Sequence, residues 1–451
     1  MSNSIAKQLE DGMRARRQSF GDLRARRSCL VVAICALTAL AVLVPDSAGA
    51  APPRPGPLDV GGEIDGARYR IVVPANWNGK LLVFAHGYRD RADHPGEVDD
   101  RRVVIAPCAT CAAPLLGEGW ALAGSAYKSN GWAVKEALDD LVALTSHFRD
   151  TIAKPERIVL VGQSMGSLPT LRLAERNGGA FDGYIAKCSV GAGAPRAFDT
   201  TVADLQLAYE VTFGMPATWG TVGDVRDDLD FESEVLPLLF GQLSDPLNLG
   251  EFEFIRLVTG TPGSGLTPPP GLYPEALFEP FFFATEGAAE AERRAGGPIV
   301  QNLDHSYALS AAEKADLASL GIDADALVRA MNARRNIAAP PASRNYLERY
   351  ADYSGEIKKP VLTLHTVIDE LVPVAHESAY RQTVAAAGKS DLLVQAYTRG
   401  VGHCNLSEAQ VVAAVHALDA WLATGVAPTD ASFPAALGFV PGFTPPPWPQ
   451  P

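Results

Sequence analysis

The sequence predicts an α/β fold with a mostly parallel central sheet, helices on both faces of that sheet, and a mainly helical cap insertion. Three observations predict it. Short apolar runs alternate with helical patterns over residues 60–195 and 356–425, as in parallel strands joined by covering helices. The chain of 451 residues is 47% hydrophobic, which is enough for a large core. The stretch between the two alternating regions lacks this rhythm and is too long for a loop.

Five parts follow from this reading. Residues 1–50 are predicted to be a signal peptide, and 51–195 to be the first part of the core. Residues 196–355 are the predicted cap, where helical stretches mix with Pro/Gly-rich loops. Residues 356–430 return to the core, and 431–451 are the Pro-rich tail, whose last part, Pro441–Pro451, is expected to be extended or disordered.

The first fifty residues have the pattern of a secretory signal. Six arginines precede an apolar run, Cys29–Val44, and Ala48-Gly-Ala50 follows it. A basic region, an apolar region and an A-x-A site predict cleavage near Ala50 and a secreted protein. The run is shorter than the roughly 20 residues of a membrane span, so a membrane anchor is the less favoured reading. The pair Arg26-Arg27 leaves general secretion and twin-arginine export both open.

The charge balance excludes one class of partner. The formal charge is −13 for the whole chain and becomes −16 without residues 1–50, which hold seven Lys or Arg and four Asp or Glu. A protein this acidic repels nucleic acid, and no basic stretch interleaved with aromatic residues offsets the charge. We therefore expect no nucleic-acid binding, and no stable membrane span in the mature form.

The centre of the predicted core is a strand followed by a sharp turn and a helix. The apolar run Arg157–Val161 leads into Gly162-Gln-Ser-Met-Gly166, and a helical pattern continues to Asn177. A serine exposed at such a turn needs a strained backbone and small neighbours, which glycines supply. Ser164 is therefore the candidate nucleophile. Alone, the five-residue pattern is equally typical of a turn bounded by glycines.

A second predicted strand, Lys80–Ala85, ends at His86-Gly87-Tyr88. This setting suits one half of an oxyanion hole, whose donor would be a backbone N–H near Tyr88. His86 is expected to be a scaffold residue and not a proton carrier. The other expected core elements of this half are strands at 69–73, 121–125 and 184–190, a short helix near 113–119 and a helix over 132–148.

The second half of the core supplies a candidate acid and a candidate base. Asp369 follows the predicted strand Pro360–His365, at the sheet edge where ligand-facing groups collect, and Glu370 is its local rival. His403 lies in a glycine-rich loop between the last predicted strand and the closing helix, which suits a base that reaches Ser164. The remaining histidines are expected to be surface or packing residues: His94, His147, His305, His365, His376 and His416.

Four cysteines follow the predicted signal. Cys108-Ala-Thr-Cys111 has the spacing of a redox motif, but it lies in a loop and favours a local structural bridge. The four cysteines allow one or two bridges among three possible pairings, and a bridge from Cys404 would tether the loop of His403. If Cys108 and Cys111 pair, elimination leaves Cys188 as the partner of Cys404. No second cysteine pair has zinc-ligand spacing, so neither a metal nor a cofactor is expected.

Taken together, these motifs resemble the α/β-hydrolase superfamily, over about residues 60–195 and 356–425. The resemblance rests on the serine turn, the His-Gly-Tyr turn, the Asp-x-x-Val-Pro segment and the Gly-His loop, which occur in the family's order. It implies a Ser164-His403-Asp369 triad, and an oxyanion hole from the backbone N–H groups of Met165 and Tyr88. The cap matches nothing assignable.

The expected activity is that of a secreted serine esterase, similar to a carboxylesterase or lipase, acting through an acyl-enzyme. Short-to-medium apolar acyl esters are expected to be preferred over amides, with the aromatic cluster Phe278–Phe283 in the cap core or close to the acyl group. A secreted exopeptidase on the same fold is the runner-up, and it would need a clamp for a free amino terminus. A non-catalytic binding protein of this fold is a third reading, which an intact triad disfavours.

Overall fold

The computed structural model describes residues 56–90, 100–176, 179–263 and 274–448. The predicted signal peptide and His94 lie outside the described residues. Within these ranges, no helix combines the length and the apolar character that crossing a bilayer requires.

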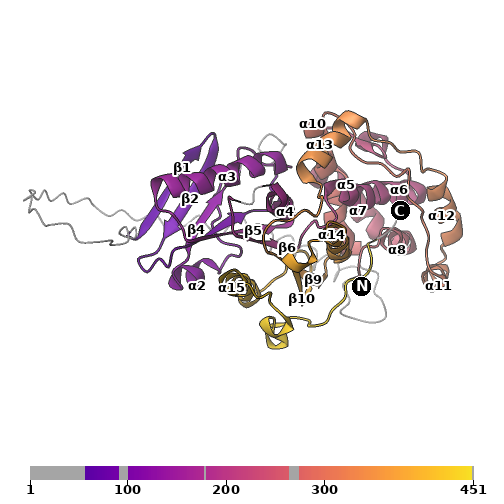
Figure 1. Ribbon diagram of the computed structural model, residues 1–451. Coiled ribbons are helices and arrows are strands. Elements are labelled where there is room, and N and C mark those ends of the chain that lie inside the picture. The colour runs from indigo at the N-terminus through magenta and orange to yellow at the C-terminus, as the bar shows by residue number, and fades with distance from the viewer. Residues whose placement is uncertain (1–55, 91–99, 177–178, 264–273, 449–451) are drawn as a thin grey trace, which may run out of the picture. The chain divides into compact units, whose positions relative to one another are not determined.

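The core is an eight-stranded sheet in the order β1-β2-β4-β3-β5-β6-β9-β10 (Figure 1). β2 pairs antiparallel with β1 and β4, and every other neighbouring pair is parallel. The inner strands are buried on both faces, which explains their continuous apolar runs. The strands are β1 Leu58–Ile64, β2 Ala67–Val73, β3 Lys80–Ala85, β4 Ala121–Ser125, β5 Arg157–Gln163, β6 Gly183–Lys187, β9 Val361–Ile368 and β10 Leu393–Val401.

Helices cover both faces of this sheet (Figure 1). On one face α3 (Val134–Thr151), α4 (Ser167–Arg176) and α14 (Ala375–Ala386) bury apolar side chains in one large cluster. On the other face α2 (Ala112–Gly117) and α15 (Glu408–Thr424) build a second cluster with the opposite side chains of the strands. The predicted α/β class with a mostly parallel, doubly covered sheet is confirmed.

The described residues between β6 and β9 form short helices joined by loops, together with the two-residue strands β7 (Gly220–Thr221) and β8 (Asp224–Val225). Sequence periodicity indicated helices around 203–212, 312–320 and 324–334, and the structure has helices at all three places. It adds several short ones, which the frequent Pro and Gly residues keep from joining. The α-helices and π-helical turns are α5 Ala194–Ala197, a π-helical turn Phe198–Ala203, α6 Asp204–Phe213, a second π-helical turn Phe231–Val235, α7 Leu236–Leu243, α8 Leu249–Val258, α9 Phe278–Ala284, α10 Glu286–Ala295, α11 Ala311–Ser319, α12 Ala324–Asn332 and α13 Pro341–Ala351.

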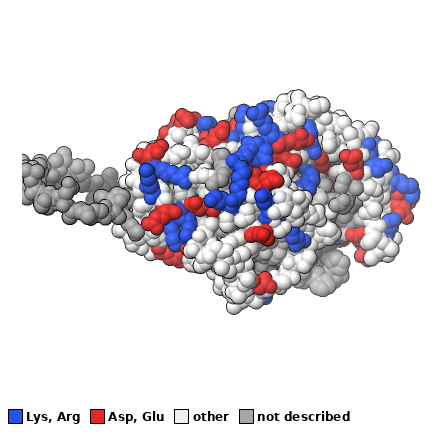
Figure 2. Space-filling view, in the orientation of Figure 1, with Lys and Arg blue, Asp and Glu red and all other residues white. Residues whose placement is uncertain are grey.

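This middle segment packs against the core at several places. α13 lies against α3 and α4, and Glu290 on α10 accepts a hydrogen bond from the backbone of Trp132 (3.3 Å). Arg294 on α10 also donates to Glu136 at the start of α3 (3.1 Å). On the face drawn in Figure 2, Lys and Arg side chains gather near the middle and Asp and Glu side chains flank them.

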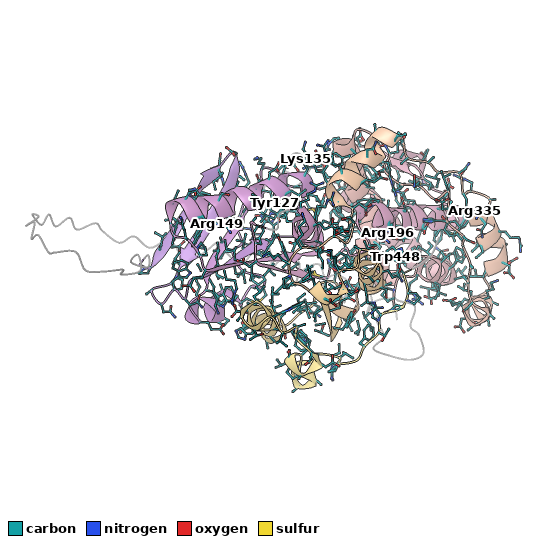
Figure 3. The ribbon with its side chains drawn as sticks, viewed as in Figure 1. Tyr127, Lys135, Arg149, Arg196, Arg335 and Trp448 are labelled. Carbon is teal, nitrogen blue, oxygen red and sulfur yellow. A yellow bond between two sulfur atoms is a disulfide. The ribbon has the colours of Figure 1, made fainter. Side chains whose placement is uncertain are left out.

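The described part of the tail packs against the core. It contains two short 3₁₀ turns, Asp430–Ser432 and Ala435–Leu437, and from Phe443 to Trp448 it forms neither helix nor strand. Phe433 and Phe439 are buried in the cluster around α15. Trp448 packs edge to face on His376 of α14, with ring centroids 4.4 Å apart (Figure 3). Ser378 Oγ donates to the Pro446 carbonyl (2.6 Å). The aromatic residues between the prolines supply the apolar area that a proline-only tail would lack.

Candidate active site

Ser164 lies at the sharp turn between β5 and α4. Its backbone is left-handed, with φ of 53°, a conformation that costs a non-glycine residue free energy and is typical of functional sites. The two glycines of the motif are sterically required. A Cβ on Gly162 would lie 2.2 Å from the carbonyl oxygen of Gly166, and one on Gly166 would lie 2.2 Å from the Ala85 carbonyl oxygen. The turn therefore fits only because strand, turn and helix approach with no side chain between them.

His403 joins Ser164 to Asp369. Its Nε2 lies 2.8 Å from Ser164 Oγ, and its Nδ1 lies 2.9 and 3.0 Å from the two oxygens of Asp369. The three residues follow the carboxyl ends of β5, β9 and β10. β9 and β10 are neighbours in the sheet, and only β6 separates β5 from β9. The structure thus brings together the three residues singled out in the sequence, at distances that allow proton transfer.

Asp369 is completely buried. Its Oδ1 accepts hydrogen bonds from the backbone N–H groups of Leu371 (3.1 Å) and Val372 (2.8 Å). Burial opposes the charge, but the charge of His403 and hydrogen bonds from two histidines outweigh burial and hold the pKa of this carboxyl below its ordinary value. Glu370, the local rival, is partly exposed and makes no such bond to His403. The carboxylate that faces the histidine is that of Asp369.

The His403 loop is tied down on both sides. Gly402 donates its N–H to the Ile368 carbonyl (2.9 Å), and Cys404 forms a disulfide with Cys188 at the end of β6. The predicted pairing is confirmed, as is the local Cys108–Cys111 bridge. Burial disfavours the charged form of His403, but the Asp369 carboxylate outweighs it and raises the pKa of His403.

The two expected oxyanion donors flank Ser164. Met165 is buried directly after it, and a Cβ on Gly87 would lie 3.8 Å from Ser164 Oγ, so the backbone before Tyr88 runs close to the serine. The roles of Met165 and Tyr88 remain predictions. The His86 ring stacks on Tyr127, with centroids 4.0 Å apart, and its pKa is lowered to about 3 by burial, which suits the scaffold role expected of it.

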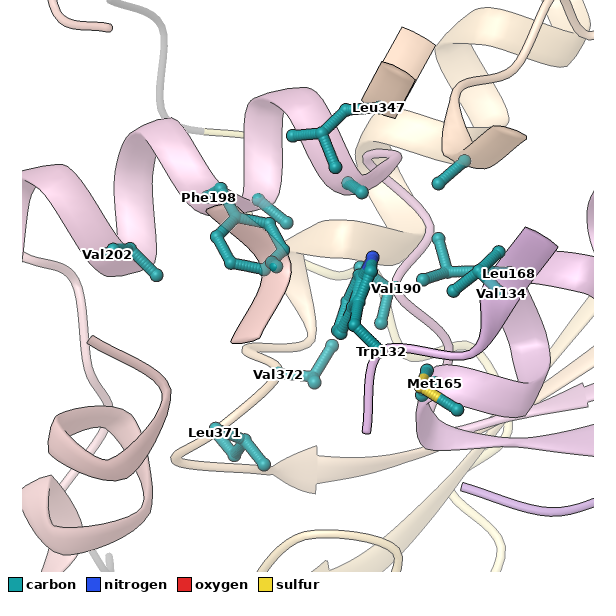
Figure 4. Close-up of a cluster of buried hydrophobic side chains, with 14 of the residues drawn as sticks. Trp132, Val134, Met165, Leu168, Val190, Phe198, Val202, Leu347, Leu371 and Val372 are labelled. Carbon is teal, nitrogen blue, oxygen red and sulfur yellow. The ribbon is translucent and has the colours of Figure 1, made fainter. Parts of the chain in front are cut away.

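A mainly apolar pocket of about 50 Å³ opens beside Ser164. Its walls come from the core and from the middle segment together (Figure 4). Phe283 of α9 lines it, whereas Phe281 is buried and packs on Tyr209, so the aromatic cluster divides between wall and core. The other lining residues are apolar except for Thr201 and His376: Trp132, Met165, Val190, Ala197, Phe198, Thr201, Val202, Leu371, Val372 and His376.

Three of the histidines expected to be surface or packing residues have ionisable partners. His416 Nε2 lies 2.7 Å from Glu118 at the surface. His305 Nδ1 lies 2.8 Å from Asp204 within the middle segment. His365, on β9, lies between Asp369 and Glu377, and all three are fully buried. One signal was present in the sequence: a histidine inside an apolar parallel strand, four residues before the candidate acid, is costly to bury without partners.

Among the described residues, the group of possible metal ligands that lies close together is Cys188, His403 and Cys404. Both sulfurs belong to the disulfide and cannot act as thiolate ligands. The group therefore does not fit a resident metal ion.

The order of the elements is that of an α/β-hydrolase fold. The serine turn follows β5 of the mixed sheet, and the acid and the histidine follow β9 and β10, which is the Ser-Asp-His chain order of that fold. The predicted fold class is confirmed on this topology.

No protein-family model matches the chain. The chain is 23% identical over 421 residues to the o-phthalyl amidase of Xanthobacter agilis, covering 82% of this chain and 88% of that protein. Among solved structures it is similar to an acylaminoacyl peptidase of Pyrococcus horikoshii, with a TM-score of 0.36 and 11% identity over 78% of this chain and 38% of that one. It is also similar to epoxide hydrolase A of Mycobacterium thermoresistibile, with a TM-score of 0.37 and 17% identity over 80% and 97% of the two chains.

Proposed function

We propose that this chain is a serine hydrolase that cleaves carboxylic esters through a Ser164-His403-Asp369 triad and an acyl-enzyme. The observation that carries the proposal is the position of His403, with one ring nitrogen 2.8 Å from Ser164 Oγ and the other 2.9 Å from Asp369. A serine hydroxyl is a weak nucleophile unless a neighbouring base takes its proton, and this geometry supplies the base.

In the proposed mechanism, His403 Nε2 accepts the Ser164 proton while Oγ attacks the substrate carbonyl. Asp369 keeps the other proton of His403 on Nδ1 and stabilises the imidazolium that forms. Backbone N–H groups of Met165 and Tyr88 would bind the oxyanion. His403 then protonates the leaving alcohol, and water, activated by the same histidine, releases the acid.

The pocket supports a short acyl group. Its volume of about 50 Å³ is well below the roughly 150 Å³ of a cavity that takes up benzene. Its walls are mainly apolar, and each buried CH₂ of an acyl chain contributes about 0.8 kcal/mol. Residues 196–355 act in this proposal as a cap, since α9 contributes Phe283 to the pocket and packs on Tyr88 of the core, with ring centroids 5.3 Å apart.

Amide cleavage is the alternative, because the curated relative is named an o-phthalyl amidase. An amide needs the same triad together with efficient protonation of a poorer leaving group. Export belongs to the proposal as well: the sequence of residues 1–50 has the signal pattern, and the two disulfides are typical of an oxidising compartment.

The discriminating experiment is kcat/KM on p-nitrophenyl acetate, butyrate and octanoate beside alanyl and prolyl p-nitroanilides and an o-phthalyl amide. We expect the short esters to exceed every amide, and octanoate to fall below butyrate because the pocket is narrow. Turnover of the o-phthalyl amide above the best ester would replace the esterase proposal by an amidase, and fast anilides would replace it by a peptidase.

The same panel on Phe283→Ala tests the pocket wall. Enlarging the pocket should raise the ratio of octanoate to acetate several-fold, since one wall of the acyl site is removed. Phe278→Ala is the matched control: Phe278 lies on the same helix and packs on Phe240, outside the pocket. An unchanged ratio in Phe283→Ala would remove α9 from the acyl site.

The proposed base also determines the pH dependence. His403 must be neutral to accept a proton, and Asp369 raises its pKa, so activity should be lost as pH falls through that value. We expect kcat/KM on an ester to rise through one limb whose midpoint lies above the ordinary histidine value of about 6.5. A flat profile between pH 5 and 8, tested in overlapping buffers of constant ionic strength, would contradict a histidine base.

A further inference from the structure

Three fully buried ionisable groups lie in series behind His403, and the proposed mechanism uses only the first. Asp369 faces His403, His365 lies 3.5 Å behind Asp369, and Glu377 lies 3.2 Å behind His365. His365 comes from β9 and Glu377 from α14, and none of the three side chains is exposed. Burying two carboxylates and a histidine together is costly, so their arrangement needs a reason.

The contacts of His365 determine its protonation. Its Nε2 lies 2.9 Å from the carbonyl oxygen of Val372 and 3.5 Å from Asp369 Oδ2. Its Nδ1 lies 3.2 Å from Glu377 Oε1. A carbonyl oxygen and an ionised carboxylate only accept hydrogen bonds, so both ring nitrogens carry a proton. His365 is therefore an imidazolium between two carboxylates.

Glu377 is surrounded by hydrogen-bond donors, and both of its carboxylate oxygens act as acceptors. Oε1 accepts from Ser189 Oγ (2.5 Å), and Oε2 accepts from Gln395 Nε2 (2.6 Å) and from Thr363 Oγ1. Burial opposes the charge on His365, but its hydrogen bonds to Asp369 and Glu377 outweigh burial and raise the pKa of His365 to about 10. His365 therefore stays positively charged at neutral pH.

The His365–Glu377 pair acts on Asp369 in two ways, through the backbone of Val372 and through its charge. The backbone of Val372 donates its N–H to Asp369 Oδ1 and accepts from His365 at its carbonyl, so the histidine fixes the turn that holds the acid. The positive end of the pair also faces Asp369, while its negative end is farther from the triad. A nearby positive charge lowers the pKa of a histidine, and His365 acts on His403 in this sense.

Resting on the proposed function, we propose that His365 and Glu377 are positioning residues of the triad. The imidazolium of His365 holds Asp369 in place and partly offsets its charge, so that His403 loses its proton at a lower pH than an Asp–His pair alone would allow. His365 touches neither substrate nor Ser164, and it acts only through Asp369.

Other charged groups also act on these rings. Asp369 and Glu279 raise the pKa of His403. Burial raises the pKa of Glu370, and the charge of His403 opposes that rise. His376, buried beside this site, accepts the Ala192 N–H at Nδ1 and is held neutral, its pKa lowered by burial and by the charge of His365. None of these groups occupies the position behind Asp369, so a variant at His365 removes the charge behind the acid and the bond to the Val372 carbonyl, and leaves these other groups in place.

The test is His365→Gln, with His365→Gln/Glu377→Gln as a second variant that leaves no unpaired buried carboxylate if the first fails to fold. Both variants should move the acid limb of kcat/KM to higher pH by about one unit, which is about tenfold lower activity at pH 6 with the alkaline plateau retained. His305→Gln is the matched control, because it breaks a buried histidine–carboxylate pair inside the middle segment. It should leave the limb where it is.

A second readout does not depend on the substrate. In ¹⁵N-histidine-labelled protein carrying Ser164→Ala, NMR should show His365 protonated on both nitrogens above pH 8. When His365 is replaced, the pH at the midpoint of the His403 titration should rise by the same amount as the acid limb of kcat/KM. If no ester is cleaved but the NMR shift appears, the esterase proposal fails and this one stands. A neutral His365, or a limb that stays in place in both folded variants while the plateau falls, would overturn it in favour of a purely structural ion pair.

Discussion

Ser164→Ala is expected to abolish hydrolysis, with a loss in kcat on the order of 10⁵-fold or more. The reason is geometric. Ser164 Oγ is the atom that lies 2.8 Å from the base, and alanine offers nothing that His403 can activate. The oxyanion donors and substrate binding would remain, so a small rate above water is expected to persist. The measurement is single-turnover kinetics on p-nitrophenyl butyrate, with thermal unfolding followed on the same sample.

The substitution should leave the fold intact, because alanine is smaller and Ser164 is partly exposed. Ser244→Ala is the control: this serine is exposed at the end of α7, where its Oγ donates to the Phe240 carbonyl (2.7 Å), and it should keep full activity. Retention of more than a few per cent of turnover in Ser164→Ala would assign the nucleophile to another residue.

Asp369→Asn is expected to give the second-largest loss, about 10⁴-fold in kcat. An asparagine can still accept the N–H groups of Leu371 and Val372 through its oxygen. Its NH₂ group would then face His403 Nδ1, which favours the tautomer that carries its proton on Nε2 and cannot accept from Ser164. The charge that stabilises the imidazolium is also lost. The readout is kcat, with KM measured beside it, and KM should change little.

Glu370→Gln is the matched control for the acid, one residue along and equal in charge change. It should stay within about threefold of the parent, as surface substitutions away from such contacts usually do. Equal losses in the two variants would mean that the general negative charge of this loop matters, and not the hydrogen bond of Asp369 to His403.

The local parts of the fold could be predicted because each is encoded by neighbouring residues. The inner strands β3, β5 and β9 are continuous apolar runs since both of their faces are buried. The helix α15 begins at a capping box of Ser407 and Gln410 and ends at a left-handed Gly425, signals that lie within one turn of its ends. Parallel strands end at one edge of a sheet, so the residues after β5, β9 and β10 could be expected to meet.

The predicted ends of strands and helices were less accurate where tertiary contacts override the conformation that the local sequence favours. The apolar stretch after Lys187 was expected to continue as strand to Val190, but β6 ends at Lys187. Cys188 takes a left-handed backbone with φ of 42° and is bonded to Cys404. The partner lies 216 residues away, and no local signal indicates where that bond ends the strand.

By itself the sequence determined the fold class, the serine turn and the residue types available for a triad, because these depend on periodicity and on motifs a few residues long. Only the tertiary structure decided which carboxylate faces His403, which phenylalanine lines the pocket, and that His365 and Glu377 lie behind the acid. Those facts depend on how β9, α9, α14 and the His403 loop pack in space. His365 and Glu377 are only 12 residues apart in the chain, yet sequence spacing does not say which side chains of a strand and the next helix face each other. Burial then determines protonation, since a charge is tolerated in the core only where partners from other elements surround it.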